Sequence, residues 1–260
     1  MKRTETIRMP GKKSSGWVET TKTIVYAILI AVAVRSVAFE PFNIPSGSMI
    51  PTLLVGDYLF VSKYSYGYSR HSLPLSLPLI PGRIFFHQPE RGDVVVFKLP
   101  SDNRTDYIKR IIGLPGDRIQ MQKGRLYING QIVQRDRIED YTYTNEQGYT
   151  LRVTQYMETL PNGRKHRIIE MTDDGMLDNT PVYTVPPEHY FAMGDNRDNS
   201  LDSRVLPQPG YAQGVGYVPV ENLVGRAEIL FFSTNGSAEW WEPWKWPGAI
   251  RFSRFFMTIK

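Results

Sequence analysis

The sequence contains no cysteine among its 260 residues, and this absence excludes several kinds of site. The chain can form no disulfide framework, thiolate nucleophile or cysteine-ligated zinc centre. Histidine is also scarce, and no pair has a spacing typical of a metal site or a catalytic triad; the four are His71, His87, His166 and His189. The G-x-S-x-G, H-E-x-x-H, S-x-x-K and P-loop motifs are missing too. We therefore expect no metal and no cofactor.

Basic residues are concentrated at the two ends of the chain, where the formal net charge of +5 arises. Residues 1–22 hold six basic side chains against two acidic ones, and residues 240–260 hold four against one. The remainder carries 21 basic and 23 acidic residues, so it lacks the footprint of a phosphate-binding domain. We expect no nucleic-acid partner. Both basic ends adjoin apolar sequence, which indicates a membrane surface.

The single long apolar segment lies near the N-terminus, and residues 24–34 of it carry no charge. A membrane span needs about 20 residues, which this segment reaches if it extends to Phe39 with Arg35 snorkelling to the far interface. Trp17 then marks the near interface. Five basic residues precede Trp17. This pattern predicts a cytoplasmic tail over residues 1–16, an anchor over 17–39 and an exported remainder.

Two other interpretations of this segment stay open. So short a run is also compatible with a buried core helix, although no partner element is visible beside it. A cleaved secretory signal is the closer rival, because the basic and apolar regions are followed by Ala31-Val32-Ala33, which resembles a cleavage site. Anchor and cleaved signal differ in tethering, yet both export the bulk of the chain.

Short apolar or alternating runs, punctuated by Gly, Pro and Asn, predict that the exported part is mainly β. The clearest candidate strands are residues 58–62, 93–99, 107–112, 182–185 and 223–232. Asn129-Gly130 between two such runs predicts a hairpin, because this pair supplies the positive φ angles of a type I′ turn. A second hairpin is predicted at Pro161-Asn162-Gly163.

The expected fold is an N-terminal transmembrane helix followed by a β-rich core. We assign the core to residues 40–119 and 186–260, with residues 120–185 as a smaller inserted β-subdomain. Residues 68–91 read as a long surface loop. Residues 249–260 form the one later segment with a helical pattern.

Three stretches combine small polar residues and glycine beside predicted strands: 45–52, 106–117 and 194–204. Each alone has an ordinary explanation as a turn, a strand ending in a turn, or a solvated loop. A calcium loop starting at Asp195 fails, because it lacks the glycine at its sixth position and the glutamate at its twelfth.

The second stretch carries a chemical argument for catalysis. Side chains alternate along a strand, so Lys109 and Arg110 must point to opposite faces. An arginine stays protonated, whereas a lysine desolvated among apolar groups can be neutral near pH 7. A neutral lysine beside a serine hydroxyl is a working general base. In a chain without cysteine or a well-placed histidine, a Ser/Lys pair is the natural nucleophile and base.

Together the stretches resemble the bacterial type I signal peptidases, membrane-anchored serine proteases that remove signal peptides. The resemblance covers most of the chain and rests on the order of its motifs. These are Ser-Gly-Ser-Met-Ile-Pro-Thr-Leu after an anchor, Arg-Gly-Asp-Val-Val-Val-Phe, Tyr-Ile-Lys-Arg before Gly-Leu-Pro-Gly-Asp, and Gly-Asp-Asn-Arg-Asp-Asn-Ser-x-Asp-Ser-Arg. The family fold, a β-rich core with a variable inserted β-domain, agrees with the expectation above.

The resemblance implies roles for particular residues. Ser48 becomes the nucleophile and Lys109 the general base of an acyl-enzyme mechanism. The Ser46 hydroxyl and the Ser48 N–H form the oxyanion hole, and Ser200 orients the lysine amine. The supporting ion pairs around the site are formed by Asp195, Asp202, Arg204 and Arg110 near Gly194. Small side chains at substrate positions −1 and −3 enter pockets lined by Phe42, Ile44 and Ile108, while the backbone near Asp106 and Tyr107 binds the substrate as an added strand.

The resemblance also implies location and partners. We expect a single-pass protein of the bacterial inner membrane with its catalytic part on the extracytoplasmic side. Its expected partners are the signal peptides of secreted precursors, membrane lipid and the translocation machinery. Some relatives have two N-terminal spans, and some have a cysteine pair in the inserted domain. This chain departs from both patterns at sites away from the proposed catalytic residues.

Two other functions compete with this interpretation. Self-cleaving Ser/Lys repressors share the catalytic logic, but they lack a membrane span and the Gly-Asp-Asn-Arg-Asp-Asn-Ser stretch. A non-enzymatic envelope domain would use the polar loops as ligand contacts.

Near the C-terminus, residues 240–246 hold four tryptophans interleaved with Pro and charge, a composition typical of a lipid headgroup boundary.

Overall fold

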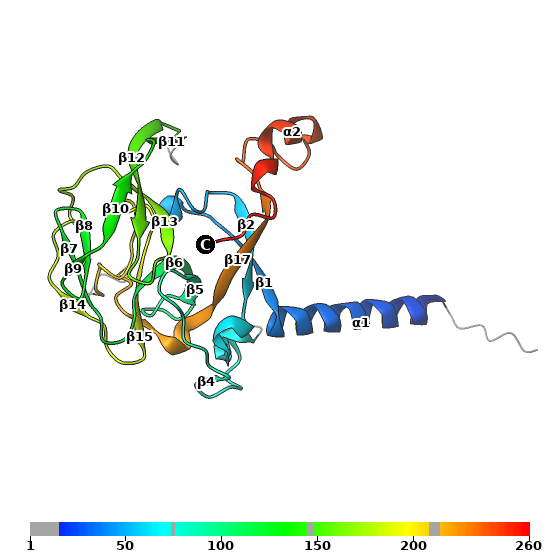
Figure 1. Cartoon of the computed structure of the whole chain (residues 1–260). Helices are drawn as coiled ribbons and strands as arrows, with labels where there is room; N and C mark the ends of the chain where they lie inside the picture. The colour runs from blue at the N-terminus through cyan, green and yellow to red at the C-terminus, as the bar shows by residue number, and fades with distance from the viewer. Residues whose placement is uncertain (1–15, 74–75, 145–147, 208–213) are drawn as a thin grey trace, which may run out of the picture.

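The computed structural model describes residues 16–73, 76–144, 148–207 and 214–260. Its largest sheet has seven antiparallel strands in the order β1-β2-β17-β5-β6-β15-β16 (Figure 1). The strands of this main sheet are β1 (Phe39–Asn43), β2 (Asp57–Ser62), β5 (Val94–Lys98), β6 (Asp106–Gly113), β15 (His189–Met193), β16 (Val218–Pro219) and β17 (Leu223–Ser233). Strands near both ends of the chain meet here, so residues far apart in sequence can form one site.

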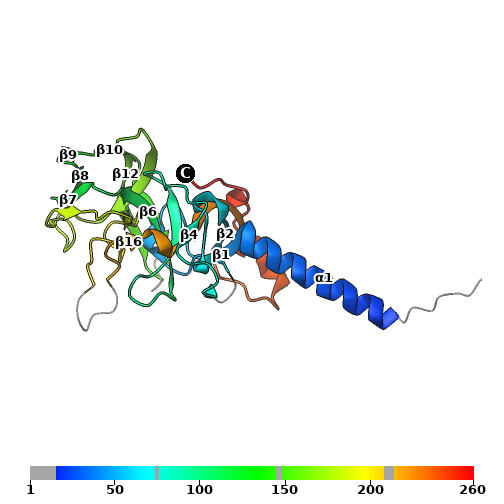
Figure 2. The ribbon, with the colours of Figure 1, turned by 90° about the horizontal axis from the view of Figure 1, so that it is seen from below.

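Helix α1 (Gly16–Val37) projects away from the β-structure (Figures 1 and 2). Its 22 residues span about 33 Å at 1.5 Å per residue, which matches a hydrocarbon core about 30 Å thick. By length and composition it is able to cross a membrane. Because the helix packs against no core, a buried core helix is the wrong interpretation of this segment. The predicted basic tail lies outside the described residues except for its last member, Gly16.

Two further sheets of four strands each lie between β6 and β15 in the described chain. One contains β7 (Arg118–Gln122), β8 (Arg125–Ile128), β9 (Gln131–Ile132) and β14 (Tyr183–Thr184). In the other, β12 (Thr150–Thr159) pairs with β10 (Gln134–Arg137), β11 (Tyr141–Thr144) and β13 (Lys165–Glu170). Both predicted hairpins are confirmed, because β8 pairs with β9 across Asn129-Gly130 and β12 pairs with β13 across Pro161-Asn162-Gly163. The turns have the expected positive φ angles, 54° and 79° at Asn129 and Gly130 and 83° at Gly163. Each of the five predicted runs contains a strand.

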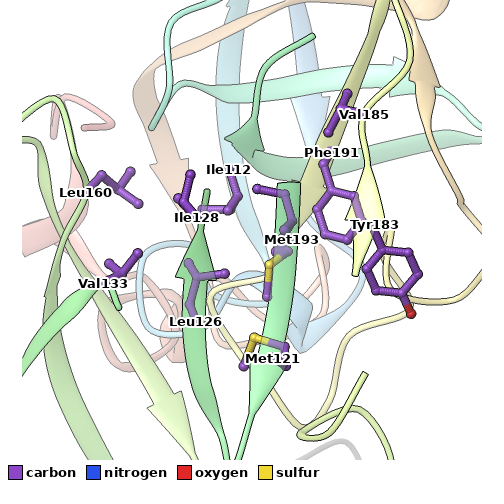
Figure 3. Close-up of a cluster of buried hydrophobic side chains, with 11 residues drawn as sticks. Ile112, Met121, Leu126, Ile128, Val133, Leu160, Tyr183, Val185, Phe191 and Met193 are labelled. Atoms are coloured by element: carbon purple, nitrogen blue, oxygen red, sulfur yellow. The ribbon is translucent and has the colours of Figure 1, made fainter. Parts of the chain in front are cut away.

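The sheet of β7, β8, β9 and β14 shares a hydrophobic core with the main sheet. Ile112 of β6 and Phe191 of β15 pack in one buried cluster with Met121, Leu126 and Ile128 (Figure 3). Most of these side chains are aliphatic and alternate along their strands, so each strand offers one apolar face to the cluster. The assignment of residues 120–185 to an inserted subdomain stays a prediction.

The C-terminal segment differs from its predicted helix. Helix α2 is one turn (Trp246–Ala249), and the chain beyond it runs along β17, with bridges from Ile250 to Thr234 and from Thr258 to Ile229. Since β5 pairs with β17 over residues 223–226, the rest of that edge has free backbone groups, which the segment satisfies. The predicted surface loop is partly ordered, because β3 (Tyr68–Ser69) pairs with β4 (Arg83–Ile84); residues 74–75 lie outside the description.

Candidate active site

Ser48 lies in a buried 3-10 turn, Gly47–Met49, on the connection from β1 to β2. Met49 and Leu53 anchor the turn, because both side chains are fully buried in a cluster with residues of the main sheet. Lys109 comes from β6, a strand inside the sheet whose backbone pairs with β5 on one side and β15 on the other. A rigid strand and an anchored turn therefore hold these two side chains.

The amine of Lys109 donates a hydrogen bond to the hydroxyl of Ser48, with 2.7 Å between Nζ and Oγ. A second bond, 3.0 Å long, goes to the carbonyl of Ile108. Lys109 is only 3% exposed, and burial lowers its pKa to about 8, although the negative charges of Asp202 and Asp195 oppose that shift. Near neutral pH this amine thus loses its proton far more readily than an exposed lysine does.

Arg110, the neighbour of Lys109 in β6, points elsewhere, as strand alternation predicts. Its guanidinium forms a two-pronged ion pair with the carboxylate of Asp195, at 2.9 and 2.7 Å, and both groups are buried. The hydroxyl of Thr52, four residues beyond Ser48, donates to the same carboxylate at 2.5 Å. Arg110 lowers the pKa of Asp195 against the effect of burial, so the carboxylate stays ionised.

A second buried ion pair, between Asp202 and Arg204, lies near the end of the loop that follows β15. Asp202 accepts two hydrogen bonds of 2.9 Å from Arg204 and one of 3.0 Å from the N–H of Gly194. These contacts fold residues 194–204 into a compact loop. Ser200 lies within it, buried against Gly194. The structure thus brings Ser200 beside the Ser48 turn, and its role in orienting Lys109 stays a prediction.

Three of the predicted substrate-binding residues pack in the apolar cluster that also contains Met49 and Leu53 of the nucleophile segment, whereas Tyr107 packs in another cluster with Phe97 and Ile111. Ile44 is buried, Phe42 and Ile108 are half-buried, and all three belong to one cluster. Asp106 is exposed and its carboxylate is 2.8 Å from Nζ of Lys98. Ser46 is exposed at the start of the 3-10 turn, two residues before Ser48.

Sequence patterns did not indicate four residues that hold the site together. Asn196 donates two hydrogen bonds to the Ser48 turn, and its neighbour Arg197 forms a buried ion pair with Glu158. His166, whose pKa is lowered by burial, lies 3.3 Å from the same carboxylate. Asn196 and Arg197 lie inside a recognised motif, which is a signal of their importance. Glu158 and His166 give no local signal, since their contacts exist only after β12 and β13 fold. Among the described residues, no three His, Cys, Asp or Glu side chains are grouped to hold a metal ion.

A buried lysine amine hydrogen-bonded to a serine hydroxyl is an arrangement of serine hydrolases that use lysine as the base. Residues 17–232 match the model of a family described as signal peptidase, peptidase S26, and the chain belongs to this family. Family membership makes it a signal peptidase I enzyme, a serine protease that cleaves signal peptides.

Relatives named signal peptidase I align over almost the full length. The one from Rickettsia typhi is 39% identical over 267 residues, covering 93% of this chain and 96% of the relative. That from Rickettsia akari is 44% identical over 253 residues, covering 90% of each. A crystal structure of a signal peptidase I from Enterococcus faecalis is 29% identical and covers 54% of this chain and 97% of that one, with a TM-score of 0.30.

Proposed function

We propose that the chain is a membrane-anchored endopeptidase that cleaves signal peptides after small residues at −1 and −3, with Ser48 as nucleophile and Lys109 as general base. The observation that carries the proposal is the 2.7 Å contact between Nζ of Lys109 and Oγ of Ser48. Burial of the amine, which lowers the pKa of Lys109 to about 8, makes the neutral form accessible at working pH.

The first half of the reaction acylates the serine. Oγ of Ser48 attacks the carbonyl carbon of the scissile bond, and Nζ of Lys109 takes the hydroxyl proton. The carbonyl oxygen becomes an oxyanion, which accepts hydrogen bonds from the Ser48 N–H and the Ser46 hydroxyl. Collapse of this intermediate breaks the C–N bond, and Lys109 returns the proton to the departing amine. The product is the mature protein, with the signal peptide held as an ester.

The second half releases the signal peptide. A water molecule attacks the ester carbonyl while neutral Lys109 takes its proton. Collapse expels Oγ of Ser48, which regains that proton from the lysine. Because one amine must accept and donate in turn, a pKa near the working pH serves both steps better than the ordinary value of a lysine.

Six residues are proposed to support the geometry of the Ser48–Lys109 pair. Ser200 orients the lysine amine, and the pairs Asp195–Arg110 and Asp202–Arg204 support it. Both pairs are buried and two-pronged, so they fix the loop geometrically. Gly194, where the chain leaves β15, leaves room for Ser200 beside the carbonyl of Ser48.

Substrate binding is proposed to follow the edge residues of the main sheet. Phe42, Ile44 and Ile108 belong to one apolar cluster, and they are proposed to line shallow pockets for small side chains at −1 and −3. The backbone near Asp106 and Tyr107 then pairs with the extended signal peptide as an added strand. Such main-chain pairing tolerates many sequences, as an enzyme with many precursors requires.

The proposed location is the bacterial inner membrane, crossed once by α1 with the N-terminus in the cytoplasm. Two ion pairs that share Glu40 join the helix to the β-structure. The carboxylate of Glu40 lies 2.6 Å from Nη2 of Arg35 and 2.8 Å from Nζ of Lys63. Lys63 is buried, so the pair links the last turn of α1 to the body. A tethered site at this surface would meet precursors as the translocation machinery delivers them.

Lipid contact by the C-terminal segment is also proposed. Trp240 and Trp244 are 79% and 72% exposed, and Phe256 is exposed as well. This segment lies on the side of the body from which α1 projects, as both views show (Figures 1 and 2). Exposed tryptophans beside basic residues suit an anionic headgroup layer.

We also propose the domain division expected from the sequence. Residues 40–119 and 186–260 form the catalytic core, and residues 120–185 form the inserted subdomain.

One assay tests the proposed function. Detergent-solubilised protein is incubated with a precursor that carries a single Ala-x-Ala site, and the new N-terminus of the product is sequenced. We expect cleavage directly after the second alanine and none with Ser48→Ala. Cleavage at another bond, or undiminished cleavage by Ser48→Ala, would contradict the proposal.

A further inference from the structure

Asn196, in the loop after β15, donates two hydrogen bonds to the turn that carries Ser48. The backbone N–H of Asn196 donates to the carbonyl of Ser48, and its side-chain Nδ2 donates to the carbonyl of Gly47; both bonds are 3.1 Å long. These two carbonyls belong to consecutive peptide units at the nucleophile. Movement of Asn196 would therefore move the Ser48 hydroxyl relative to Lys109.

Both sequence neighbours of Asn196 are held by one hairpin, β12–β13. Arg197 forms a two-pronged pair with Glu158 of β12, at 3.0 and 2.5 Å. Asp195 lies next to His166 of β13 without a hydrogen bond, since 3.9 Å separates its Oδ1 from Nε2, and its attachment to the hairpin is through the backbone. Glu158 and His166 lie directly opposite each other in the hairpin, with 3.3 Å between Oε2 and Nε2.

Backbone hydrogen bonds attach Asp195 and Arg197 to the same hairpin. Ile169 of β13 donates its N–H to the carbonyl of Asp195 and accepts from the N–H of Arg197, each bond being 3.0 Å. The loop residues 195–197 thus continue the hairpin as an extra strand segment. The carbonyl of Arg197 in turn accepts from Arg204 at 2.7 Å.

The burial of this charged group argues that it has a definite geometry. Glu158 and Arg197 are each 1% exposed, and Arg197 lowers the pKa of Glu158 to about 2 although burial opposes it. Buried charges of this kind are stable only when paired and hydrogen-bonded, so the pair allows little displacement. A one-ångström error at a nucleophile can cost about a hundredfold in rate.

We infer that the β12–β13 hairpin positions the nucleophile, with Glu158 as the positioning residue that acts through Arg197 and Asn196 on the Ser48 turn. The inference rests on the proposed role of Ser48. It gives the segment between β6 and β15 a part in catalysis that is separate from substrate binding. Glu158 itself touches no reacting atom.

The test compares Glu158→Gln with Asp136→Asn in the full-length protein, using the Ala-x-Ala precursor. Asp136 is an exposed acid of β10, in the same small sheet, so its replacement controls for the loss of a carboxylate. We expect kcat to fall about tenfold to a hundredfold for Glu158→Gln, with KM within about twofold of wild type. The acid limb of the pH profile should stay in place, because burial is the largest cause of the lowered pKa of Lys109 and the charges that act on it most are those of Asp202, Asp195 and Arg204.

Two further variants keep the inference falsifiable if Glu158→Gln does not fold. Arg197→Lys retains the charge and loses the two-pronged geometry, so it should lower kcat in the same way. Asn196→Ala should lower kcat, and combining it with Arg197→Lys should add little, because both act on one contact. Thermal unfolding confirms that each variant is folded at the assay temperature.

The outcomes separate the two proposals. If folded Glu158→Gln and Arg197→Lys match Asp136→Asn in kcat, or change KM alone, the positioning role is wrong while the Ser/Lys mechanism stands. If the wild-type protein cleaves no precursor, or Ser48→Ala cleaves as well as wild type, both proposals are wrong.

Discussion

A β-carbon on Gly194 would overlap the hydroxyl oxygen of Ser200. On the same side it would lie 2.5 Å from the carbonyl oxygen of Ser48, a separation that real side chains do not reach. Gly194 is thus the residue whose small size lets the loop after β15 pack against the nucleophile turn. Its requirement is steric, because its φ is not in the left-handed region.

This contact predicts that Gly194→Ala lowers kcat about a hundredfold or more, because either Ser200 or the Ser48 turn must move. Overpacking of this kind typically costs about 1–3 kcal/mol of stability. Gly248→Ala is the matched control, since a β-carbon there meets nothing within 4 Å and the backbone is not strained. Kinetics and thermal unfolding of both variants check the prediction, and full activity of Gly194→Ala would contradict it.

The Ser48–Lys109 contact predicts that the two residues act as one unit. Ser48→Ala and Lys109→Ala should each abolish cleavage in a folded protein, and the double variant should be no worse than either. Lys109→Arg should be inactive too, because a guanidinium keeps its proton. Single-turnover rates and circular dichroism measure these effects. An active Lys109→Arg enzyme would rule out the general-base role.

Ser46 is predicted to donate to the oxyanion. Ser46→Ala should lower kcat about 10²- to 10³-fold and leave KM nearly unchanged, because the bond is made in the transition state. Ser46→Thr, which keeps the hydroxyl, should retain most of the activity. Steady-state kinetics of the two variants test this role. An equal loss of kcat in Ser46→Ala and Ser46→Thr would contradict it, because the hydroxyl is kept in only one of them.

Much of the fold follows from local patterns in the sequence. The type I′ signal at Asn129-Gly130 and the alternation of Lys109 and Arg110 need only short-range physics, and the structure has both. The helix expected over residues 249–260 was wrong because propensity does not register the open edge of β17 that this segment covers.

Other contacts depend on the folded arrangement of distant segments. Glu158 and Arg197 are 39 residues apart, and their pairing requires both the register of the β12–β13 hairpin and the path of the loop after β15. Nothing in the neighbourhood of Glu158 distinguishes it from a surface acid of an amphipathic strand. For the proposed base, by contrast, the chemistry of a desolvated lysine singled out Lys109 before the fold was considered, whereas the choice of Ser48 among the serines came from the resemblance of its motif to the signal peptidase family.

The exposed tryptophans predict that membrane attachment does not depend on α1 alone. A chain lacking residues 1–39 should still bind anionic vesicles at low salt, and removal of residues 240–260 as well should weaken the binding. Replacing Trp240 and Trp244 by serine is a milder variant, since both side chains are largely exposed. Sedimentation with vesicles measures the bound fraction. If the chain without its anchor stays wholly in the supernatant, the proposed lipid contact is wrong.

The central claim is that the neutral amine of Lys109 is the base for Ser48. The pH dependence of Ser48 acylation, followed in a single turnover, tests it most directly. Burial lowers the pKa of Lys109 to about 8, and the reactive form is the deprotonated one, so the rate should be low in acid, rise through pH 8 and then level off. Replacing the four histidines should leave this acid limb in place. A limb near about pH 6.5 that disappears with a histidine would contradict the assignment of the base.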